Sequence, residues 1–362
     1  MKDRLEKYRE KLAGSDIDSA IIVTSEKRIN KNVFYLTGFT GEDGYLYVSK
    51  DKAILFVDGR YPEQAREQVW NGITVQLAEF PIVDFLGKQA ADFGVKSVGI
   101  EDSAISHAFA KRLAEKCEGI AFKCADNLIE PLRQIKSLEE IERIRQACKV
   151  ADEAFNATLS HVKAGVSETD VCVELEYQMK RRGALKPSFD IIVASGYRGA
   201  MAHGVASDKK IENGEFVVFD WGCIFNGYCS DCTRTIVVGD PTPRHREIYG
   251  LVRSAQEAAM AYFKPGVKCA DADKASREPI IAGGYPNSYN HSLGHGVGLD
   301  IHESPGASSR SEQVFEENMI CTNEPGLYFE GWGGVRIEDT VWVSKDGAVP
   351  LTTLPKEMIV IE

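Results

Sequence analysis

The hydrophobic and polar positions of residues 1–130 follow two different periods. Short runs rich in β-branched and aromatic residues predict strands, and segments with apolar residues at helical spacing predict helices. The strands are expected at 19–24, 44–49 and 52–57, and the helices at 1–14, 61–70 and 109–117. Helices interspersed with strands in this way predict an α/β domain with a mixed sheet.

A long amphipathic helix is predicted to open a second domain. Ser137 and Glu140 have the capping-box spacing of a helix N-terminus, and apolar residues follow at helical intervals. A chain of 362 residues also exceeds the usual size of one hydrophobic core. We therefore expect two domains, at 1–132 and 133–362.

The second domain contains an ordered internal duplication. Each copy has a tight turn before a helix, a His-Gly pair, a strand that leads to an acidic residue and a glycine, and a further strand with a second acid. The matching positions are Lys163 and Lys264, His203 and His295, Gly222 and Gly326, and Ser230 and Ile337. The repeat predicts two α+β halves related by a pseudo-twofold axis.

A β-hairpin in the first half carries two aspartates. Asn226-Gly227 is a type I′ turn signal between two β-rich runs. A two-residue loop would place Thr233 opposite Asp220 and Asp231 opposite Gly222. Asp220 and Asp231 would then be diagonal neighbours on one face, about 7–8 Å apart at Cα. The absence of a side chain at Gly222 is expected to leave space beside Asp231.

Paired carboxylates of this kind repel each other unless a cation lies between them. Taken alone, the pair is more simply interpreted as two solvent-facing aspartates. The duplication favours the cation, because Glu324 takes the place of Asp220 and Glu338 that of Asp231, while His295 adds an imidazole. Four carboxylates and one imidazole suit two borderline-hard divalent ions such as manganese, cobalt, zinc or iron.

Composition and short motifs narrow the function classes. A net charge of −11 disfavours nucleic acid as a partner. The chain has neither the apolar run of a membrane span nor the apolar core of a signal peptide, so we expect a cytoplasmic protein with no membrane partner. The nine cysteines favour reduced thiols. "GHGVG" lacks the full dinucleotide-binding pattern, and the single CxxC at Cys229 and Cys232 lacks the second pair of a zinc ribbon, which leaves packing or redox roles.

Five motifs in order resemble the creatinase, aminopeptidase P, prolidase and methionine aminopeptidase family. They are "AHG" at 202–204, "FDWG…SDCTRT" at 219–235, "HSLGHGVGLDIHE" at 291–303, "NEPGLYF" at 323–329 and "GVRIEDT" at 334–340. "FYLTGFTG" at 34–41 and "FVDGRY" at 56–61 resemble the N-terminal domain of the aminopeptidase P and prolidase branches. The resemblance implies an α/β N-terminal domain and an α+β pita-bread catalytic domain.

The resemblance also implies two divalent metal ions per chain, with manganese as the first expectation. Asp231 and Glu338 would bridge the ions, Asp220 would chelate one of them, and His295 and Glu324 would bind the other. An activated hydroxide would attack the scissile carbonyl, with Glu324 as the general base.

Four further residues have implied roles around the substrate. His302 would stabilise the oxyanion, and His203 would contact the substrate near the scissile nitrogen. His291 would line the pocket for proline, and Arg336 would hold a ligand carboxylate in place. Asn323, where a β-branched residue is usual, and Met201-Ala202, where Leu-Pro is common, depart from the family pattern without removing a ligand.

The two-domain layout implies hydrolysis of the bond before proline in proline-containing peptides. Our first expectation is an Xaa-Pro aminopeptidase, because "HESPGAS" resembles the aminopeptidase P branch. The alternative is an Xaa-Pro dipeptidase, in which Arg310 could hold the carboxylate of the dipeptide. A binding module on the same fold and a creatinase-type amidinohydrolase, both without metal, are the rival classes, and the intact ligand set argues against them. The resemblance also implies a homodimer.

Overall fold

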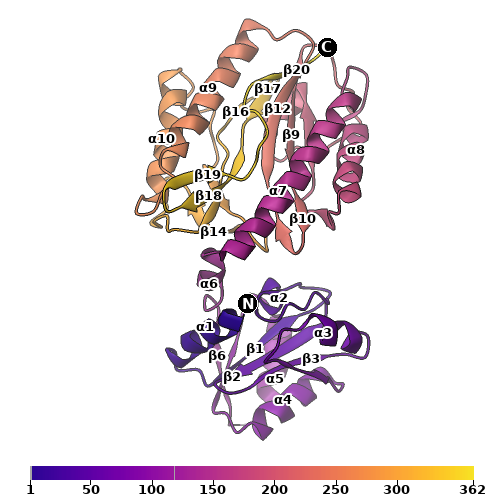
Figure 1. Ribbon diagram of the computed structural model, residues 1–362, viewed down its shortest axis with the longest axis vertical. Helices are drawn as coiled ribbons and strands as arrows, with labels where there is room; N and C mark the ends of the chain where they lie inside the picture. The colour runs from indigo at the N-terminus through magenta and orange to yellow at the C-terminus, as the bar shows by residue number, and fades with distance from the viewer. Residues whose placement is uncertain (1, 118) are drawn as a thin grey trace. The chain divides into compact units, whose positions relative to one another are not determined.

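The structure is a computed structural model that describes residues 2–117 and 119–362. The chain divides into two compact units, Met1–Arg133 and Gln134–Glu362 (Figure 1). Each unit has its own hydrophobic core. No helix in the described part of the chain is long and apolar enough to cross a membrane. All nine cysteines are free thiols in this structure.

The first unit is an α/β domain built on a six-stranded mixed sheet in the order β4-β3-β2-β1-β5-β6. The central strands β1 to β3 are antiparallel, whereas β4, β5 and β6 each join a neighbour in parallel. The strands are β1 Ser19–Thr24, β2 Gly44–Ser49, β3 Ala53–Val57, β4 Thr74–Leu77, β5 Ser97–Ile100 and β6 Ala121–Cys124. The helices are α1 Lys2–Ala13, α2 Lys31–Thr37, α3 Pro62–Gln68, α4 Ile82–Asp92, α5 His107–Lys116 and α6 Glu130–Gln134.

The expected elements of this unit are confirmed as β1, β2, β3, α1, α3 and α5. The central strands are buried along their whole length, which explains their continuous hydrophobic runs. The edge strands β4 and β6 were missed because they are short and largely solvent-exposed, so neither has a distinct hydrophobic pattern.

The first half of the second unit packs two helices against a sheet that is antiparallel except for the parallel pair β12 and β20. The capping box of Ser137 and Glu140 opens α7, as predicted. Phe155 of α7 stacks on Trp221 of β9 with ring centroids 4.5 Å apart. The elements are α7 Leu138–Thr158, α8 Glu168–Arg181, the four-stranded sheet of β20 Ile359–Ile361, β12 Cys232–Val238, β9 Glu215–Trp221 and β8 Ile192–Ser195, and the small sheet of β11 Tyr228–Cys229, β10 Cys223–Phe225 and β7 Lys186–Pro187.

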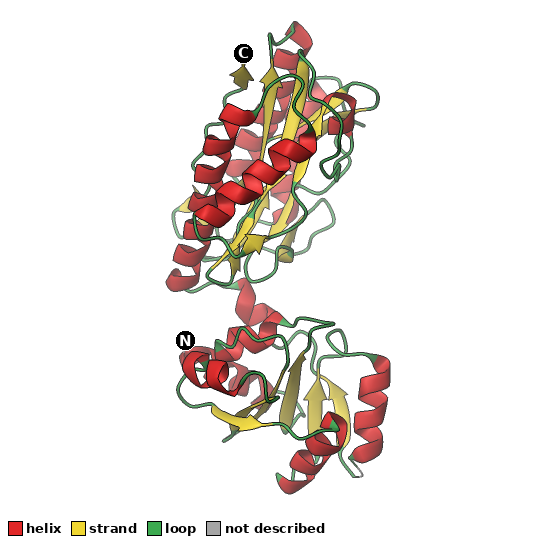
Figure 2. Ribbon diagram, turned by 90° about the vertical axis from the view of Figure 1, so that its right-hand side faces the viewer, coloured by secondary structure: helices red, strands yellow, loops and turns green. Residues whose placement is uncertain are grey.

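The second half repeats this plan with α9 and α10 beside a five-stranded sheet, and the strands of both halves lie among the helices of the unit (Figure 2). Its elements are α9 Pro243–Met260, α10 Cys269–Ala282, the sheet of β14 Glu303–Ala307, β13 Gly294–Gly296, β15 Ile320–Asn323, β18 Asp339–Ser344 and β19 Gly347–Pro350, and the pair β16 Gly326–Phe329 and β17 Gly333–Arg336.

The internal duplication is confirmed in the backbone. The turns before α8 and α10 both contain a glycine at positive φ, 88° at Gly165 and 87° at Gly266. In each turn the glycine N–H donates to a distant carbonyl, that of Ile211 in the first half and Phe315 in the second. The two halves therefore share one construction, as a pseudo-twofold pita-bread fold requires.

The predicted hairpin register is also confirmed. Phe225 pairs with Tyr228 across the turn, and Thr233 pairs with Asp220 farther along. The expectation of open space at Gly222 is wrong, because a Cβ atom there would lie 1.8 Å from the carbonyl oxygen of Ser230. The strand is interrupted at this point, and the glycine allows close backbone approach rather than room for a ligand.

Candidate metal centre and cavity

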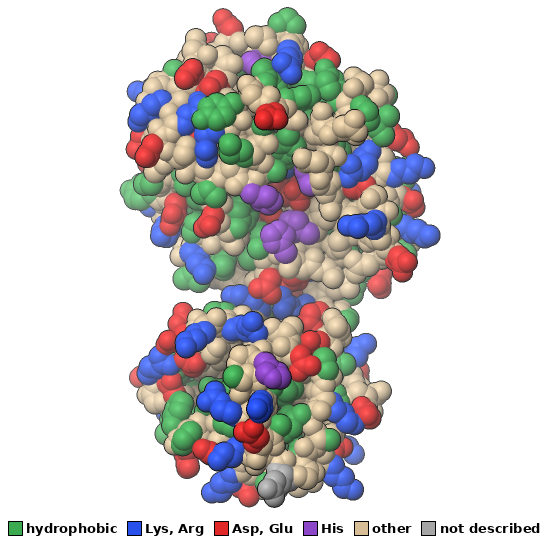
Figure 3. Space-filling view, turned by 180° about the vertical axis from the view of Figure 1, so that it is seen from behind, with side chains coloured by type: hydrophobic (Ala, Val, Ile, Leu, Met, Phe, Trp, Pro, Cys, Tyr) green, Lys and Arg blue, Asp and Glu red, His purple; other side chains and the backbone are tan. Residues whose placement is uncertain are grey.

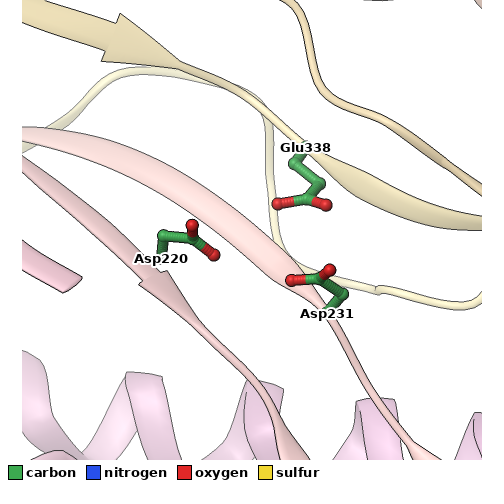
Figure 4. A group of neighbouring side chains, drawn as sticks. All are labelled: Asp220, Asp231 and Glu338. Carbon is green, nitrogen blue, oxygen red and sulfur yellow. The ribbon is translucent and has the colours of Figure 1, made fainter. Parts of the chain in front are cut away.

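Three acidic side chains from both halves converge in the second unit. Asp220 lies near the end of β9, Asp231 directly precedes β12, and Glu338 directly precedes β18. One carboxylate oxygen of each lies within 4.8 Å of the other two, and the three groups point toward one another (Figure 4). The diagonal placement predicted for the two aspartates therefore brings their carboxylates together.

The strand pairings explain why the acids meet. Thr233 of β12 pairs with Asp220 of β9, and Asp339 of β18 pairs with Asn323 of β15 in the other half. In both halves one acid therefore lies at the end of a strand, and the other lies just before the antiparallel neighbour of that strand. Glu338 N–H donates to the Thr233 carbonyl at 3.1 Å, which links the two pairs.

His295 and Glu324 complete the set. The His295 Nε2 atom lies 3.5 Å from an Asp231 oxygen and 3.4 Å from a Glu324 oxygen. The Nδ1 atom of His295 lies 3.1 Å from the Gly296 carbonyl oxygen. Because a carbonyl can only accept, Nδ1 donates the hydrogen bond and the Nε2 lone pair faces the carboxylates, as in a metal-binding histidine.

The four carboxylates outnumber the single arginine that lines the cavity with them in the described part of the chain. Burial, and then the neighbouring carboxylates, raise the pKa values of Asp231 and Glu338 well above their usual range. Burial raises the pKa of Glu324 to about 7. Asp220 Oδ1 and Glu338 Oε1 are buried without a hydrogen-bond partner. Buried carboxylates are stable when they are paired or bind a metal, so this donor set fits divalent cations.

Arg336 supplies positive charge beside the acids. Its guanidinium donates to Asp220 Oδ2 at 2.6 Å and to Thr233 Oγ1 at 3.0 Å. It also donates to the Tyr328 hydroxyl at 2.7 Å and to the Ala202 carbonyl at 3.3 Å. Arg336 thus orients one carboxylate of the cluster and connects it to two other parts of the cavity.

Two threonines that were not predicted from the sequence orient the acids. Thr233 Oγ1 donates to Glu338 Oε2 at 2.6 Å, and Thr322 Oγ1 donates to Glu324 Oε1 at 2.9 Å while it accepts the N–H of His295. The predicted register already placed Thr233 opposite Asp220, so that position could have been identified. Nothing comparable in the sequence distinguished Thr322.

His291 is held from both sides of its ring. Its Nδ1 donates to the Ser292 carbonyl at 2.8 Å, so its Nε2 accepts from the Tyr328 hydroxyl at 3.1 Å. Burial and then Arg336 lower the pKa of His291 to about 4, so the ring is neutral at pH 7. Tyr328, which the sequence analysis also missed, therefore fixes the orientation of this imidazole.

The segment that carries His291 is tied to α10. The buried Asp273 accepts from Arg277 Nε at 2.7 Å and from the Leu293 N–H at 3.0 Å. Arg277 in turn donates to the carbonyl oxygens of Tyr289 and His291. One carboxylate on the helix thus holds the backbone that delivers the histidine.

The acids and histidines line one cavity of about 540 Å³, a size typical of small-molecule sites. On the face shown in Figure 3, histidine side chains gather around a hollow with acidic atoms within it. His302 packs against His295 with ring centroids 4.2 Å apart, and His203 lines the cavity from the loop after η2 Gly196–Ala200. The other lining residues include Phe189, Asp190, Ile192, Val205 and Ile301.

Two further residues singled out in the sequence do not line the cavity. Arg310 is exposed on the loop after β14 and is absent from the cavity lining, so the structure does not support it as a carboxylate clamp. Asn323 is fully buried, and its amide donates to the Gln256 carbonyl at 2.9 Å. This bond accounts for a polar residue at an otherwise apolar position.

The fold and this donor set together define a pita-bread metallopeptidase. The model of metallopeptidase family M24 matches residues 142–345, and that of the creatinase/prolidase N-terminal domain matches residues 4–135. The chain belongs to metallopeptidase family M24. The expected fold and family are therefore confirmed. Enzymes of this family depend on a dinuclear metal centre.

Several relatives resemble the chain over nearly its whole length. An Xaa-Pro dipeptidase of Pyrococcus horikoshii is 41% identical over 360 residues, which cover 99% of both chains. The solved structure of an Xaa-Pro dipeptidase from Bacillus anthracis is 40% identical, with a TM-score of 0.94 and 99% coverage of both chains. That of an X-Pro aminopeptidase from Thermotoga maritima is 35% identical, with a TM-score of 0.92, and covers 97% of this chain and all of the other.

Proposed function

We propose that this chain hydrolyses the peptide bond before proline and that Xaa-Pro dipeptides are its preferred substrates. The observation that carries the reaction class is the convergence of four carboxylates and one imidazole in a single cavity. The preference for dipeptides rests on the relatives named Xaa-Pro dipeptidase. It replaces the aminopeptidase that the sequence motifs favoured first.

Five residues would hold two divalent cations, for which manganese is our first candidate and cobalt, zinc and iron the others. They are Asp220, Asp231, His295, Glu324 and Glu338. Bound divalent ions supply Lewis acidity, which polarises the scissile carbonyl and makes a water molecule more acidic. A carboxylate-rich set with one imidazole suits such borderline-hard ions.

The residues around this centre would carry the remaining chemistry. Glu324 takes the proton of the attacking water, and His302 donates a hydrogen bond to the developing oxyanion. His203 contacts the substrate near the scissile nitrogen, while His291, fixed by Tyr328, lines the pocket for the proline ring. The water oxygen ends on the new carboxylate, the C–N bond breaks, and the proline nitrogen takes up a proton.

An Xaa-Pro aminopeptidase is the second candidate, and the charges of the cavity favour it. Arg336 is the single arginine or lysine among the described residues that line the cavity, and it is already paired with Asp220. A dipeptide carboxylate would therefore meet neutral hydrogen-bond donors rather than a free cation. A longer peptide does not require such a cation, because its carboxylate lies farther from the scissile bond.

Metal removal and substrate length test the proposal. We expect about two metal ions per chain, loss of Ala-Pro hydrolysis on chelation, and recovery when manganese is restored. A dipeptidase leaves Ala-Pro-Ala intact, whereas an aminopeptidase releases alanine from it. A protein that stays inert with manganese or cobalt would disprove the proposed hydrolysis and favour a binding module. The homodimer and the cytoplasmic location also stay predictions, to be checked by light scattering and cell fractionation.

A further inference from the structure

We propose that Glu168 is a positioning residue for the substrate-facing histidine His203. The proposal rests on the function proposed above, because it concerns how that site is assembled. Glu168 begins α8 and is fully buried, yet it binds no residue of the metal cluster. Its carboxylate instead holds both ends of the loop that carries His203.

Five hydrogen bonds converge on this carboxylate. At one end of the loop, the N–H and the hydroxyl of Ser195 donate to Oε1 at 2.7 and 2.9 Å. At the other end, the N–H and the hydroxyl of Ser207 donate to Oε2 at 3.1 and 2.7 Å. Arg198 Nε donates to Oε2 at 2.9 Å. Each oxygen thus serves one end of the segment 195–207.

Arg198 extends this arrangement into the middle of the loop. Its Nη2 donates to the Val205 carbonyl at 2.6 Å, two residues from His203. The Val205 N–H in turn donates to the His203 carbonyl at 2.9 Å. The backbone at His203 is therefore connected to Glu168 through three hydrogen bonds and one guanidinium.

The loop is also seated against the strand that carries Arg336. A Cβ atom on Gly334 of β17 would lie 2.1 Å from the Gly199 carbonyl oxygen, so the two backbones are in direct contact. Arg336 itself donates to the Ala202 carbonyl. Small shifts of the loop would therefore move His203 relative to the metal centre.

His203 depends on its backbone for its position. Its side chain is exposed, and among the described residues no hydrogen bond or ion pair to its imidazole is present. A side chain without its own partners is placed by the segment that carries it. Because a displacement of about 1 Å from productive geometry can cost roughly 100-fold in rate, the support of the loop affects catalysis.

A carboxylate suits this role better than other buried groups. Its two oxygens offer about four acceptor positions and no donor, so they accept all five converging hydrogen bonds when two donors share one position. An amide at the same place can accept at only one of its two heteroatoms. Buried charged groups add little net stability compared with apolar residues. We therefore infer that the charge of Glu168 serves the conformation of the loop rather than the stability of the fold.

Glu168→Gln tests the proposal, with Asp152→Asn as the matched control. Asp152 is also buried and accepts two hydrogen bonds from Thr353, but it does not contact the loop. We expect kcat/KM for Ala-Pro to fall by about 10- to 100-fold in Glu168→Gln, with the metal content unchanged. The control should lose comparable thermal stability and keep its activity within about threefold.

A double-mutant cycle separates positioning from general destabilisation. If Glu168 acts through His203, Glu168→Gln should lower kcat/KM by less than about threefold in a His203→Ala background. A full additional loss in that background would overturn the proposal. If Glu168→Gln fails to fold, Arg198→Ala replaces it in the same cycle. This variant keeps the hydrogen bonds of Ser195 and Ser207 to Glu168.

Amide hydrogen exchange gives a readout that needs no substrate. We expect residues 195–207 to exchange at least about tenfold faster in Glu168→Gln than in the wild type, with no change there in Asp152→Asn. Equal exchange would overturn the proposal even if activity falls. If the metal-loaded wild type does not cleave Xaa-Pro peptides, the proposed function fails, while the exchange experiment still decides whether Glu168 holds the loop.

Discussion

At the scale of single residues, a few side chains organise the cavity, because each of them makes hydrogen bonds to several other groups. Arg336 has four acceptors, and only one of them belongs to the acidic cluster. Thr233 of the first half accepts from Arg336 and donates to Glu338, which both belong to the second half. Orientation of the acids is thus shared between both halves.

Arg336→Lys tests this organisation because it retains the charge and removes the planar fork. A lysine cannot donate in the same directions to Asp220, Thr233 and Tyr328 at once. We expect manganese affinity to weaken by about 10- to 100-fold, as is usual when a group that orients a metal ligand is lost. Competition with a chelating dye measures the change. Arg253→Lys, at an exposed ion pair with Glu257, is the control, and equal affinities in the two variants would refute the role.

At the scale of elements, equivalent helices in the two halves hold equivalent segments. Glu168 on α8 binds the loop before β9 that carries His203, and Asp273 on α10 binds the segment before β13 that carries His291. In both cases a buried carboxylate works together with an arginine, Arg198 or Arg277. The duplication therefore extends from the acidic ligands to the support of the histidines.

The interrupted hairpin gives a prediction at this scale. Gly222→Ala would push a Cβ atom into the Ser230 carbonyl, next to Asp231. We expect a loss of about 1–3 kcal/mol in the free energy of unfolding, as for other overpacked sites. Gly250→Ala is the matched control, because a Cβ atom there meets nothing within 4 Å and alanine favours α9 by up to about 1 kcal/mol. Urea unfolding of the metal-free variants measures both, and unchanged stability in Gly222→Ala would contradict the steric argument.

Local sequence patterns predicted those features that depend on residues close together in the chain. The Asn226-Gly227 turn determined a register that held as far as Asp220 and Thr233, because each strand residue follows from the previous one. The same pattern could not show the close backbone approach at Gly222. Long-range contacts decide such details, and a single sequence does not contain them explicitly.

The supporting residues of the candidate site illustrate the same limit. The five acidic and imidazole positions were recognisable from motifs that recur in both halves. Glu168, in contrast, looks like an ordinary acidic residue in the first turn of a capped helix. Its partners lie in an irregular segment without periodicity, so nothing along the chain indicated that Ser195 and Ser207 meet at one carboxylate.

At the scale of the whole molecule, the stability of each unit depends on its own buried acidic groups. The acidic cluster belongs to Gln134–Glu362, whereas the first unit contains its own buried acid, Glu101. Glu101 accepts amide hydrogens from Asn30 and Asn32. Burial is the main cause that raises its pKa from 4.5 to about 7. The stability of the second unit should therefore respond to metal, whereas that of the first unit should respond to pH and not to metal.

Glu101→Gln tests the response of the first unit to pH. Because the folded state binds this proton more tightly than the unfolded state, the stabilisation is complete below about pH 4.5 and is lost as the pH rises through about 7. The shift corresponds to about 3 kcal/mol. We expect the substitution to flatten the dependence of stability on pH between 5 and 8.

Calorimetry of the full chain measures this effect in the transition that does not respond to manganese. Glu63→Gln, on the exposed side of α3, serves as the control and should leave the slope as it is in the wild type. A Glu101→Gln variant with the wild-type slope would show that another group titrates in this unit.

The attachment of the His203 loop at its two ends has a consequence for how such enzymes diversify. Tyr197, Met201 and Val205 lie between the attachment points, and their large apolar side chains are exposed. Val205 also lines the cavity, so mutations on this loop can alter the cavity wall without touching Ser195, Ser207 or any acid of the cluster. Selection, in nature or in a laboratory library, can thus explore new peptide preferences on this loop while the hydrolytic machinery is inherited intact.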